Sequence, residues 1–328
     1  MIDLIIHMGL PKTGSTTIQN KLWKKDLGFV GKLKGSKKQN DFGKQLKYAS
    51  PAKKGKIVIN QAHNWCKRLQ QYINSEYPGL ERIIVSHEDL SSLTSEHPMT
   101  LWPLGYHNSY VYDNQIIRFL YELSQEAWTV GKVKVLLVLR NQPEWLASLY
   151  AQISKVMKGA SQQDFEKRIN KIVEGKDDYL DWSKWVNDLY NYFGTENVCI
   201  LLLEDMKTES FWQRLAQFTQ TEIAPEQYKS ITDSYLNKRR ESENIWTIPS
   251  IRPIKYIKTN WKPNTNRFTY TTVLQTTRFV STFIDITRFD RERGTTIELH
   301  DELRKQILDY CRPFNEKLAE KLGMDLHV

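Results

Sequence analysis

Short apolar runs alternate with segments of helical periodicity along the chain, which is the pattern of an α/β protein. Nearly continuous runs rich in Ile, Leu and Val stand at residues 4–9, 82–86, 133–140 and 198–203. Runs of this kind are typical of strands that are buried on both faces, as in a parallel sheet. The sequence therefore predicts an α/β fold with a central, mostly parallel sheet flanked by helices.

The segments between these runs divide into helices and long irregular stretches. Apolar residues recur at helical intervals in 57–77 and 114–127, so each segment is expected to form a helix. Residues 91–112 and most of 225–290 lack a clear period. We expect a single domain over 1–328, with these two stretches as insertions on the acceptor side of its site.

Positive charge is concentrated in one segment. The chain has a formal net charge of +9, and residues 24–56 contain eleven lysines and two aspartates. A lysine- and glycine-rich stretch is usually a solvated loop, and it also suits a flexible flap that attracts an anionic substrate. No recognised nucleic-acid-binding module accompanies this charge, so nucleic acid is not an expected partner.

Cysteine usage and hydropathy favour an intracellular protein without a membrane span. Cys66, Cys199 and Cys311 are far apart and form no C-x-x-C pair, so we expect reduced thiols rather than a disulfide framework or a zinc site. No apolar run approaches the ~18 residues that cross a bilayer. The first strand begins close to Met1, which leaves no room for a signal peptide. A cytoplasmic location is therefore expected.

The candidate chemistry begins where the first apolar run ends. The loop Gly9-Leu10-Pro11-Lys12-Thr13-Gly14 leads from a strand into a helix, and the backbone N–H groups at such a junction form a binding site for phosphate. The glycine spacing matches the start of the nucleotide-binding loop G-x-x-x-x-G-K-[ST], but Ser15 stands where that loop has its lysine. A kinase needs that lysine at the transferred phosphate, so a different phosphate-bearing donor is expected.

Residues 7–17, His-Met-Gly-Leu-Pro-Lys-Thr-Gly-Ser-Thr-Thr, resemble the 5′-phosphosulfate loop of the sulfotransferases that use 3′-phosphoadenosine-5′-phosphosulfate (PAPS). The resemblance implies a P-loop-like three-layer fold. It also implies transfer of a sulfuryl group to a hydroxyl or amine, with a carbohydrate as a candidate acceptor and adenosine 3′,5′-bisphosphate (PAP) as product. In this interpretation Lys12 contacts the bridging and leaving oxygens. The residues implied to bind the 5′ end of the donor are Pro11, Lys12, Thr13, Gly14, Ser15, Thr16 and Thr17.

The resemblance continues after the third apolar run. Arg140 stands at the end of that run, and Ser148 lies one to two turns into the helix that begins near Pro143. This pair resembles the 3′-phosphate site of the same family, and a guanidinium is suited to bidentate contact with a phosphate. Near the C-terminus, Arg293, Gly294 and Thr295 resemble the basic glycine loop that folds over the donor in carbohydrate sulfotransferases.

Two candidates for the catalytic base follow the second strand. If the strands are parallel, this strand delivers His87 and Glu88 to the edge of the sheet where Lys12 lies. Members of the family have either a histidine or a glutamate here, so the sequence leaves the choice open. No metal is required in principle, because the transferred group is close to neutral SO₃ and carries less charge than metaphosphate.

Two other classes of protein stay open on the sequence. One is a P-loop kinase of a small molecule, and the other is a non-catalytic protein that binds nucleotides or polyanions. The serine at position 15 counts against the kinase, and the matched pair of Arg140 and Ser148 counts against the binding protein. The identity of the acceptor is not readable from the sequence.

Overall fold

The computed structural model describes residues 2–23, 28–29, 42, 59–76, 78–87, 115–128, 130–175, 180–233, 240–242, 244–250, 294–324 and 326. The expected lysine-rich flap lies outside these residues except for positions 28, 29 and 42. The expected insertion at 91–112 and residues 251–290 of the second insertion also lie outside them. The single-domain organisation with its flap and insertions therefore stays a prediction.

Four parallel strands form the central sheet, in the order β2-β1-β3-β4. They are β1 (Asp3–Gly9), β2 (Arg82–His87), β3 (Val133–Leu139) and β4 (Val198–Leu202). All four predicted strands are thus confirmed. The nearly continuous apolar run of β3 is explained by its position, because it pairs with β1 on one side and with β4 on the other and is covered on both faces.

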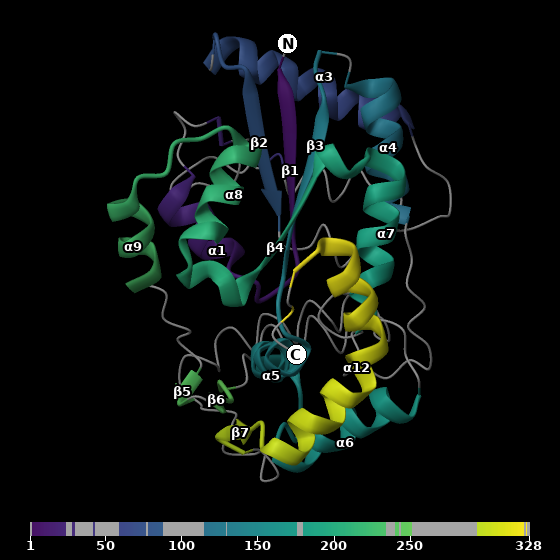
Figure 1. Cartoon of the computed structure of the whole chain (residues 1–328), viewed down its shortest axis with the longest axis vertical. Helices are drawn as coiled ribbons and strands as arrows, with labels where there is room; N and C mark the ends of the chain where they lie inside the picture. The colour runs from purple at the N-terminus through teal and green to yellow at the C-terminus, as the bar shows by residue number, and fades with distance from the viewer. Residues whose placement is uncertain are drawn as a thin grey trace, which may run out of the picture.

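Helices cover both faces of this sheet, so the predicted three-layer α/β architecture is confirmed (Figure 1). One core cluster joins the strands to α3 (Ile59–Glu76), α4 (Gln115–Glu122) and α7 (Trp182–Phe193). The other cluster joins them to the first helix, α8 (Glu209–Thr219) and α9 (Pro225–Asp233). The first helix consists of α1 (Ser15–Thr17) and the π-helical turn η1 (Ile18–Leu22).

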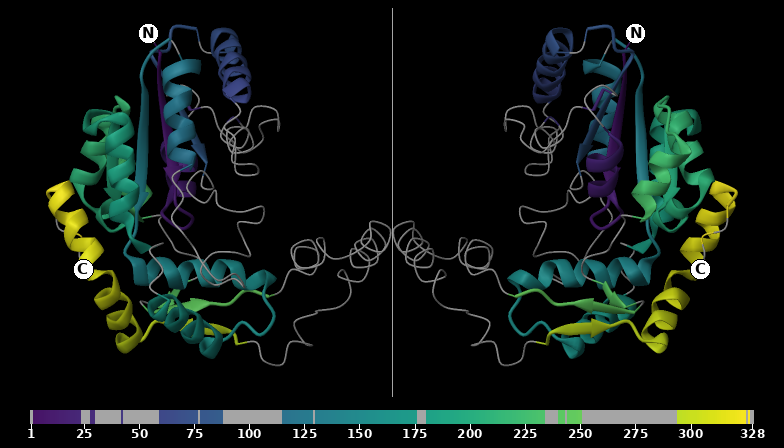
Figure 2. Two further views of the ribbon diagram at one scale, coloured as in Figure 1. Left: turned by 90° about the vertical axis from the view of Figure 1, so that its right-hand side faces the viewer. Right: turned by 90° about the vertical axis from the view of Figure 1, so that its left-hand side faces the viewer.

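A third group of elements lies beyond the carboxyl ends of the strands. Helix α5 (Gln142–Ile153) crosses below these ends, and a small antiparallel sheet lies beneath it (Figures 1 and 2). The other elements of the group are α6 (Gln162–Glu174), β5 (Arg240–Ser242), β6 (Ile245–Thr247), β7 (Thr296–Glu298) and α12 (Asp301–Leu322). The remaining helical turns are η5 (Leu123–Ala127), η6 (Ser154–Val156), η8 (Thr195–Asn197) and η9 (Leu203–Lys207).

Helix α12 braces the start of α5. The buried side chains of Gln142 and Asn315 exchange two amide hydrogen bonds, of 2.6 and 3.2 Å. Arg304 of α12 forms an ion pair with Glu144 and donates to Asn244 Oδ1 at 2.9 Å. These contacts fix the helix that follows Arg140, and α5 is the helix on which Ser148 lies.

The three cysteines are free and buried, as expected. Within the described part of the chain, no helix is long and apolar enough to cross a membrane.

Candidate active site

Strand β1 leads directly into a loop whose backbone is left-handed at two positions. The φ angle is +71° at Lys12 and +78° at Gly14. Glycine adopts this conformation freely, whereas a residue with a side chain pays about 1–2 kcal/mol. The carbonyl of Gly14 then accepts from the N–H groups of Thr17 and Ile18, at 2.8 and 3.1 Å, which starts the first helix. Because Lys12 is strained, other contacts must hold the loop in this shape.

Three side chains supply those contacts by binding three successive carbonyls of the loop. Thr13 Oγ1 donates to the carbonyl of Leu10 at 2.7 Å, Trp145 Nε1 to that of Pro11 at 2.7 Å, and Arg140 Nη1 to that of Lys12 at 3.1 Å. We call Thr13, Arg140 and Trp145 the carbonyl clamp. With its carbonyls bound in this way, the loop is held at the start of the first helix, where backbone N–H groups favour an anion.

Two hydroxyls of the predicted phosphate site are buried without a partner among the residues that the structure describes. Ser15 Oγ in the first helix and Ser148 Oγ in α5 have no hydrogen bond to any described residue, and these side chains are 2% and 0% exposed. Buried hydroxyls in native proteins are nearly always hydrogen-bonded, and leaving one unpaired costs about 1–3 kcal/mol. Both hydroxyls therefore fit a bound anion that accepts from them.

The structure brings the two predicted halves of the donor site together. The contact between Arg140 and the Lys12 carbonyl joins the end of β3 to the loop after β1. His87 is the last residue of β2, and its Cα is paired in register with that of Met8, directly before the loop begins. Glu88 lies outside the described residues, so the choice between the two bases stays open.

The described part of the predicted basic glycine loop lies beside the connection between α5 and α6. The N–H of Gly294 donates to the carbonyl of Ala160 at 2.8 Å, and the carbonyl of Thr295 accepts from the N–H of Ile248 at 2.7 Å. Arg293 lies outside the described residues. The role of this loop at the donor therefore stays a prediction.

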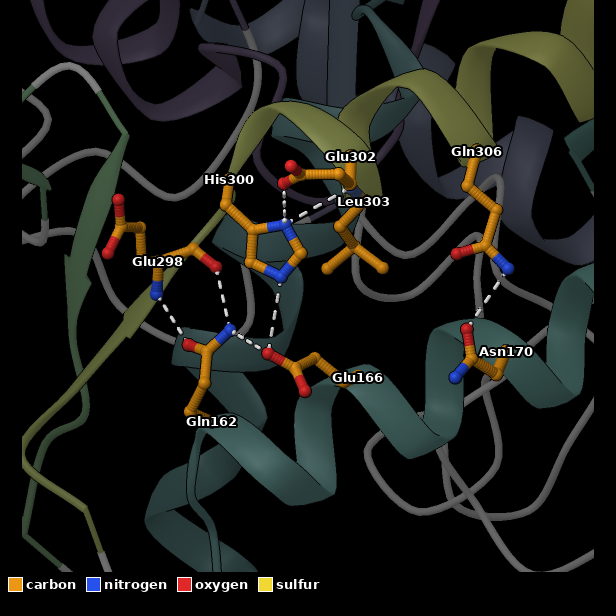
Figure 3. A network of polar contacts seen from close by, with 8 residues as sticks. All are labelled: Gln162, Glu166, Asn170, Glu298, His300, Glu302, Leu303 and Gln306. Atoms are coloured by element: carbon orange, nitrogen blue, oxygen red, sulfur yellow. Dashed lines mark hydrogen bonds and ion pairs between the residues drawn. The ribbon is translucent and has the colours of Figure 1, made fainter.

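A polar network on α6 anchors the segment that follows this loop (Figure 3). Gln162 bonds both backbone groups of Glu298, with Nε2 donating to its carbonyl at 3.0 Å and Oε1 accepting from its N–H at 2.7 Å. Gln162 Nε2 also donates to Glu166 Oε1 at 2.7 Å, and His300 Nε2 lies 3.3 Å from the same oxygen. The segment from Glu298 to His300 is therefore held against α6.

Two further residues of the site were not among the predicted site residues. Trp145 belongs to the carbonyl clamp, and Glu204 accepts from the N–H of Asn141 through Oε1 at 3.0 Å. Burial raises the pKa of Glu204, while the Asn141 N–H and the charge of Arg140 lower it. The only sequence signal for Glu204 was its position directly after an apolar run. For Trp145 there was none, because an aromatic residue inside a helix usually packs in the core.

Comparison with known proteins identifies the class to which this fold and site belong. A family model described as a sulfotransferase domain matches residues 2–257, so the chain belongs to the sulfotransferase family. Members of this family transfer a sulfuryl group from PAPS to an acceptor. The chain is thus a sulfotransferase, and a P-loop kinase is not favoured. No curated protein sequence matches it.

Solved structures of sulfotransferases are similar to this chain at low sequence identity. A sulfotransferase from Alicyclobacillus acidocaldarius is 13% identical over 70% of this chain and 89% of its own, with a TM-score of 0.39. Mouse sulfotransferase SULT7A1 complexed with PAP is 13% identical over 89% of both chains, with a TM-score of 0.35. The sulfotransferase domain of the olefin synthase from Synechococcus PCC 7002 is 10% identical over 84% of this chain and 94% of its own, with a TM-score of 0.33.

Replacing Trp145 with Phe tests the carbonyl clamp. The change keeps an aromatic ring but removes the N–H that binds the Pro11 carbonyl at 2.7 Å. We expect the free energy of unfolding to fall by about 1–3 kcal/mol and the Kd for PAP to rise about 3- to 30-fold, because the loop is no longer held. Urea denaturation and titration calorimetry with PAP measure these two quantities.

Trp182→Phe is the matched control. Trp182 is buried and packs edge-on against Trp145 at 5.8 Å between ring centroids, so this variant also loses an indole from the same cluster. It should lose stability and keep its affinity for PAP. Equal PAP affinities for W145F and the wild type would show that the indole N–H does not hold the loop.

Proposed function

We propose that this sulfotransferase binds PAPS across the loop after β1 and the start of α5, and transfers its sulfuryl group to a hydroxyl or amine of an acceptor. The observation that supports this most is the 3.1 Å hydrogen bond from Arg140 to the Lys12 carbonyl. It joins the candidate 3′-phosphate residue to the candidate 5′-phosphate loop. A guanidinium has five N–H donors, so holding a carbonyl is compatible with binding a phosphate.

The residues present fit such a donor. The loop and first helical turn offer backbone N–H groups, Lys12 offers a positive charge, and the buried hydroxyls of Ser15 and Ser148 have no partner among the described residues. We assign Pro11 to Thr17 to the 5′-phosphate, and Arg140 with Ser148 to the 3′-phosphate. Arg293, Gly294 and Thr295 are assigned to the cover of the donor, by resemblance alone.

Each residue then has a defined chemical task. The bound donor supplies the sulfuryl group on its 5′-phosphate. The ammonium group of Lys12 and the loop N–H groups stabilise the negative charge that develops on the leaving phosphate oxygen. His87 or Glu88 accepts the proton of the acceptor hydroxyl. We assign no role to a metal, and we assign the acceptor, with carbohydrates as one candidate, to the side of 91–112 and 225–290.

Arg140→Ala and Ser148→Ala test the 3′-phosphate site. Removing one partner of a desolvated charge pair costs roughly 2–5 kcal/mol, so R140A should weaken PAP at least about tenfold. S148A should weaken PAP as well, yet leave the free energy of unfolding unchanged or slightly raised, because its buried hydroxyl has no partner within the described protein. S148A should bind AMP, which lacks the 3′-phosphate, as the wild type does. R140A should weaken AMP less than PAP, because with AMP it loses only its clamp bond to the Lys12 carbonyl.

Calorimetry with PAP and AMP measures these affinities. Arg168→Ala is the matched control, since Arg168 on α6 pairs with Asp164 at 2.8 Å and lies outside the proposed site. Equal affinity of the wild type for AMP and PAP would contradict a 3′-phosphate site and the proposed donor.

Turnover should survive removal of divalent metals. The proposed mechanism gives no task to a metal, and the loop has serine where a triphosphate-binding loop has lysine. The measurement is ³⁵S transfer from labelled PAPS to a panel of glycans, phenols and lipids, with and without EDTA. Activity that is abolished by EDTA and restored by Mg²⁺ would contradict the metal-free mechanism.

The base is tested with His87→Ala and Glu88→Gln. A general base contributes about 10²–10⁴-fold, so one variant should lose that factor in kcat while keeping its affinity for PAP, and the other should lose much less. A histidine base predicts a rate that rises with pH around ~6.5, and a glutamate base predicts a rise around ~4.3. If both variants keep a near-normal kcat on an active acceptor, the base is another residue.

A further inference from the structure

A buried polar triad links three elements that surround the Lys12 loop. His7 of β1 and Ser86 of β2 are neighbours in register, with Nδ1 and Oγ 2.7 Å apart. Gln19 of η1, in the helix that follows the loop, donates from Nε2 to the same Ser86 oxygen at 2.6 Å. The hydroxyl of Ser86 is therefore the junction of the triad.

Burial keeps the imidazole of His7 in this triad uncharged. His7 is entirely buried, and desolvation lowers its pKa to about 3, so the imidazole has one donor and one acceptor nitrogen at ordinary pH. Ser86 accepts from Gln19, and the arrangement that uses its proton within the triad donates that proton to Nδ1. The imidazole ring packs edge-on against Trp23, with 5.0 Å between ring centroids. Nε2 of the same ring is buried and has no hydrogen-bond partner among the described residues.

Polar groups are costly at these positions. The core cluster on this side of the sheet is formed by apolar residues, among them Ile5 and Ile84 on the same two strands and Ile18 and Leu22 beside Gln19. A buried polar group costs free energy unless it is hydrogen-bonded. An apolar residue of similar size would fill the same space without this desolvation cost. Three polar side chains are kept here, joined by two hydrogen bonds, although Nε2 of His7 is buried without a partner among the described residues. Polar groups kept at this cost point to a task beyond packing.

The position of the triad identifies that task. Ser86 immediately precedes His87, and Gln19 follows the loop residues that end at Thr17. The hydrogen bond between Gln19 and Ser86 thus fixes the carboxyl end of β2 against the helix that presents the loop. A displacement of reacting groups by about 1 Å can cost ~10² in rate, so a fixed distance here has catalytic value.

We propose that Ser86, held by His7 and Gln19, is a positioning residue for sulfuryl transfer. It fixes the end of β2 so that the base that follows it meets the acceptor above the Lys12 loop. This inference rests on the proposed function, because it takes the base from His87 or Glu88. The triad does not touch the donor or the reacting atoms in this assignment.

Ser86→Ala and Gln19→Met test the proposal by separating rate from affinity. Each removes the hydrogen bond between the first helix and β2, so kcat with the most active acceptor of the panel, or with water where none is active, should fall about 30- to 100-fold. The Kd for PAP should stay within about threefold of the wild type, because the donor contacts are untouched. Ser86→Thr keeps the hydroxyl and should restore most of the rate.

The matched control is Thr219→Val in α8. Thr219 is also buried, and its hydroxyl bonds the Leu215 carbonyl and Thr221 Oγ1, both at 2.7 Å. This variant loses comparable hydrogen bonds without a link to the loop, so it should lose stability and keep kcat. Thermal unfolding of every variant separates a loss of stability from a loss of positioning. Gln19 is only partly buried, so Q19M tests the positioning role if S86A does not fold.

The outcomes distinguish this inference from the proposed function. A wild type that does not bind PAP overturns the proposed donor, and the inference falls with it. A wild type that binds PAP and turns over, together with S86A and Q19M variants that keep kcat, overturns the positioning role alone. A parallel loss of PAP affinity and kcat in these variants also overturns it, because the triad would then support the loop and not the base.

Discussion

The hydrogen bonds from protein side chains to the loop carbonyls are the contacts on which the site depends. A left-handed lysine costs about 1–2 kcal/mol, and one hydrogen bond contributes about 0.5–1.5 kcal/mol. Lys12, at φ +71°, is bound at its own carbonyl, and the two carbonyls before it are also bound. The summed free energy of the three clamp hydrogen bonds is therefore large enough to offset the backbone strain at Lys12. A loop that is already shaped needs no reorganisation when an anion arrives, which is the condition for electrostatic stabilisation of a transition state.

The parts of the site that were predictable from the sequence are encoded locally. Strand β1, the loop and the first helix occupy Asp3 to Leu22, and an apolar run followed by a glycine-containing loop is sufficient to identify such a unit. The positions of Arg140 at a strand end and of Ser148 in the following helix were also predictable locally, whereas their 3′-phosphate role came from the family resemblance and stays a prediction. The tasks of the clamp were not predictable, because a buried Trp145 has the same helical periodicity whether or not its N–H reaches a carbonyl from the first strand's loop.

The features that the sequence did not predict depend on contacts between residues far apart in the chain. The bond between His7 and Ser86 joins residues 79 apart in sequence, and it exists only because β1 and β2 pair in the observed register. A histidine within an apolar run was visible in the sequence, but a shift of one residue in register would turn its partner to the other face. Gln142 and Asn315 are 173 residues apart, and no local pattern relates two amides over that distance. Which side chains far apart in the chain form hydrogen bonds is thus the feature of the fold that a single sequence leaves undetermined.

The clamp and the triad hold the two ends of the site through separate contacts. Arg140 holds the backbone of the residue whose ammonium group is assigned to the leaving oxygen, and Gln19, just beyond the loop, holds the end of β2 through Ser86. Within the clamp, three side chains hold one loop and do not contribute independently, since removing one changes the geometry around the next. The effects of single substitutions here therefore cannot be summed into a total, and each measures the loss of one support from a connected structure. The buried amide pair that fixes α5 extends this connection to the C-terminal helix, so a contact far from the loop also takes part in holding its shape.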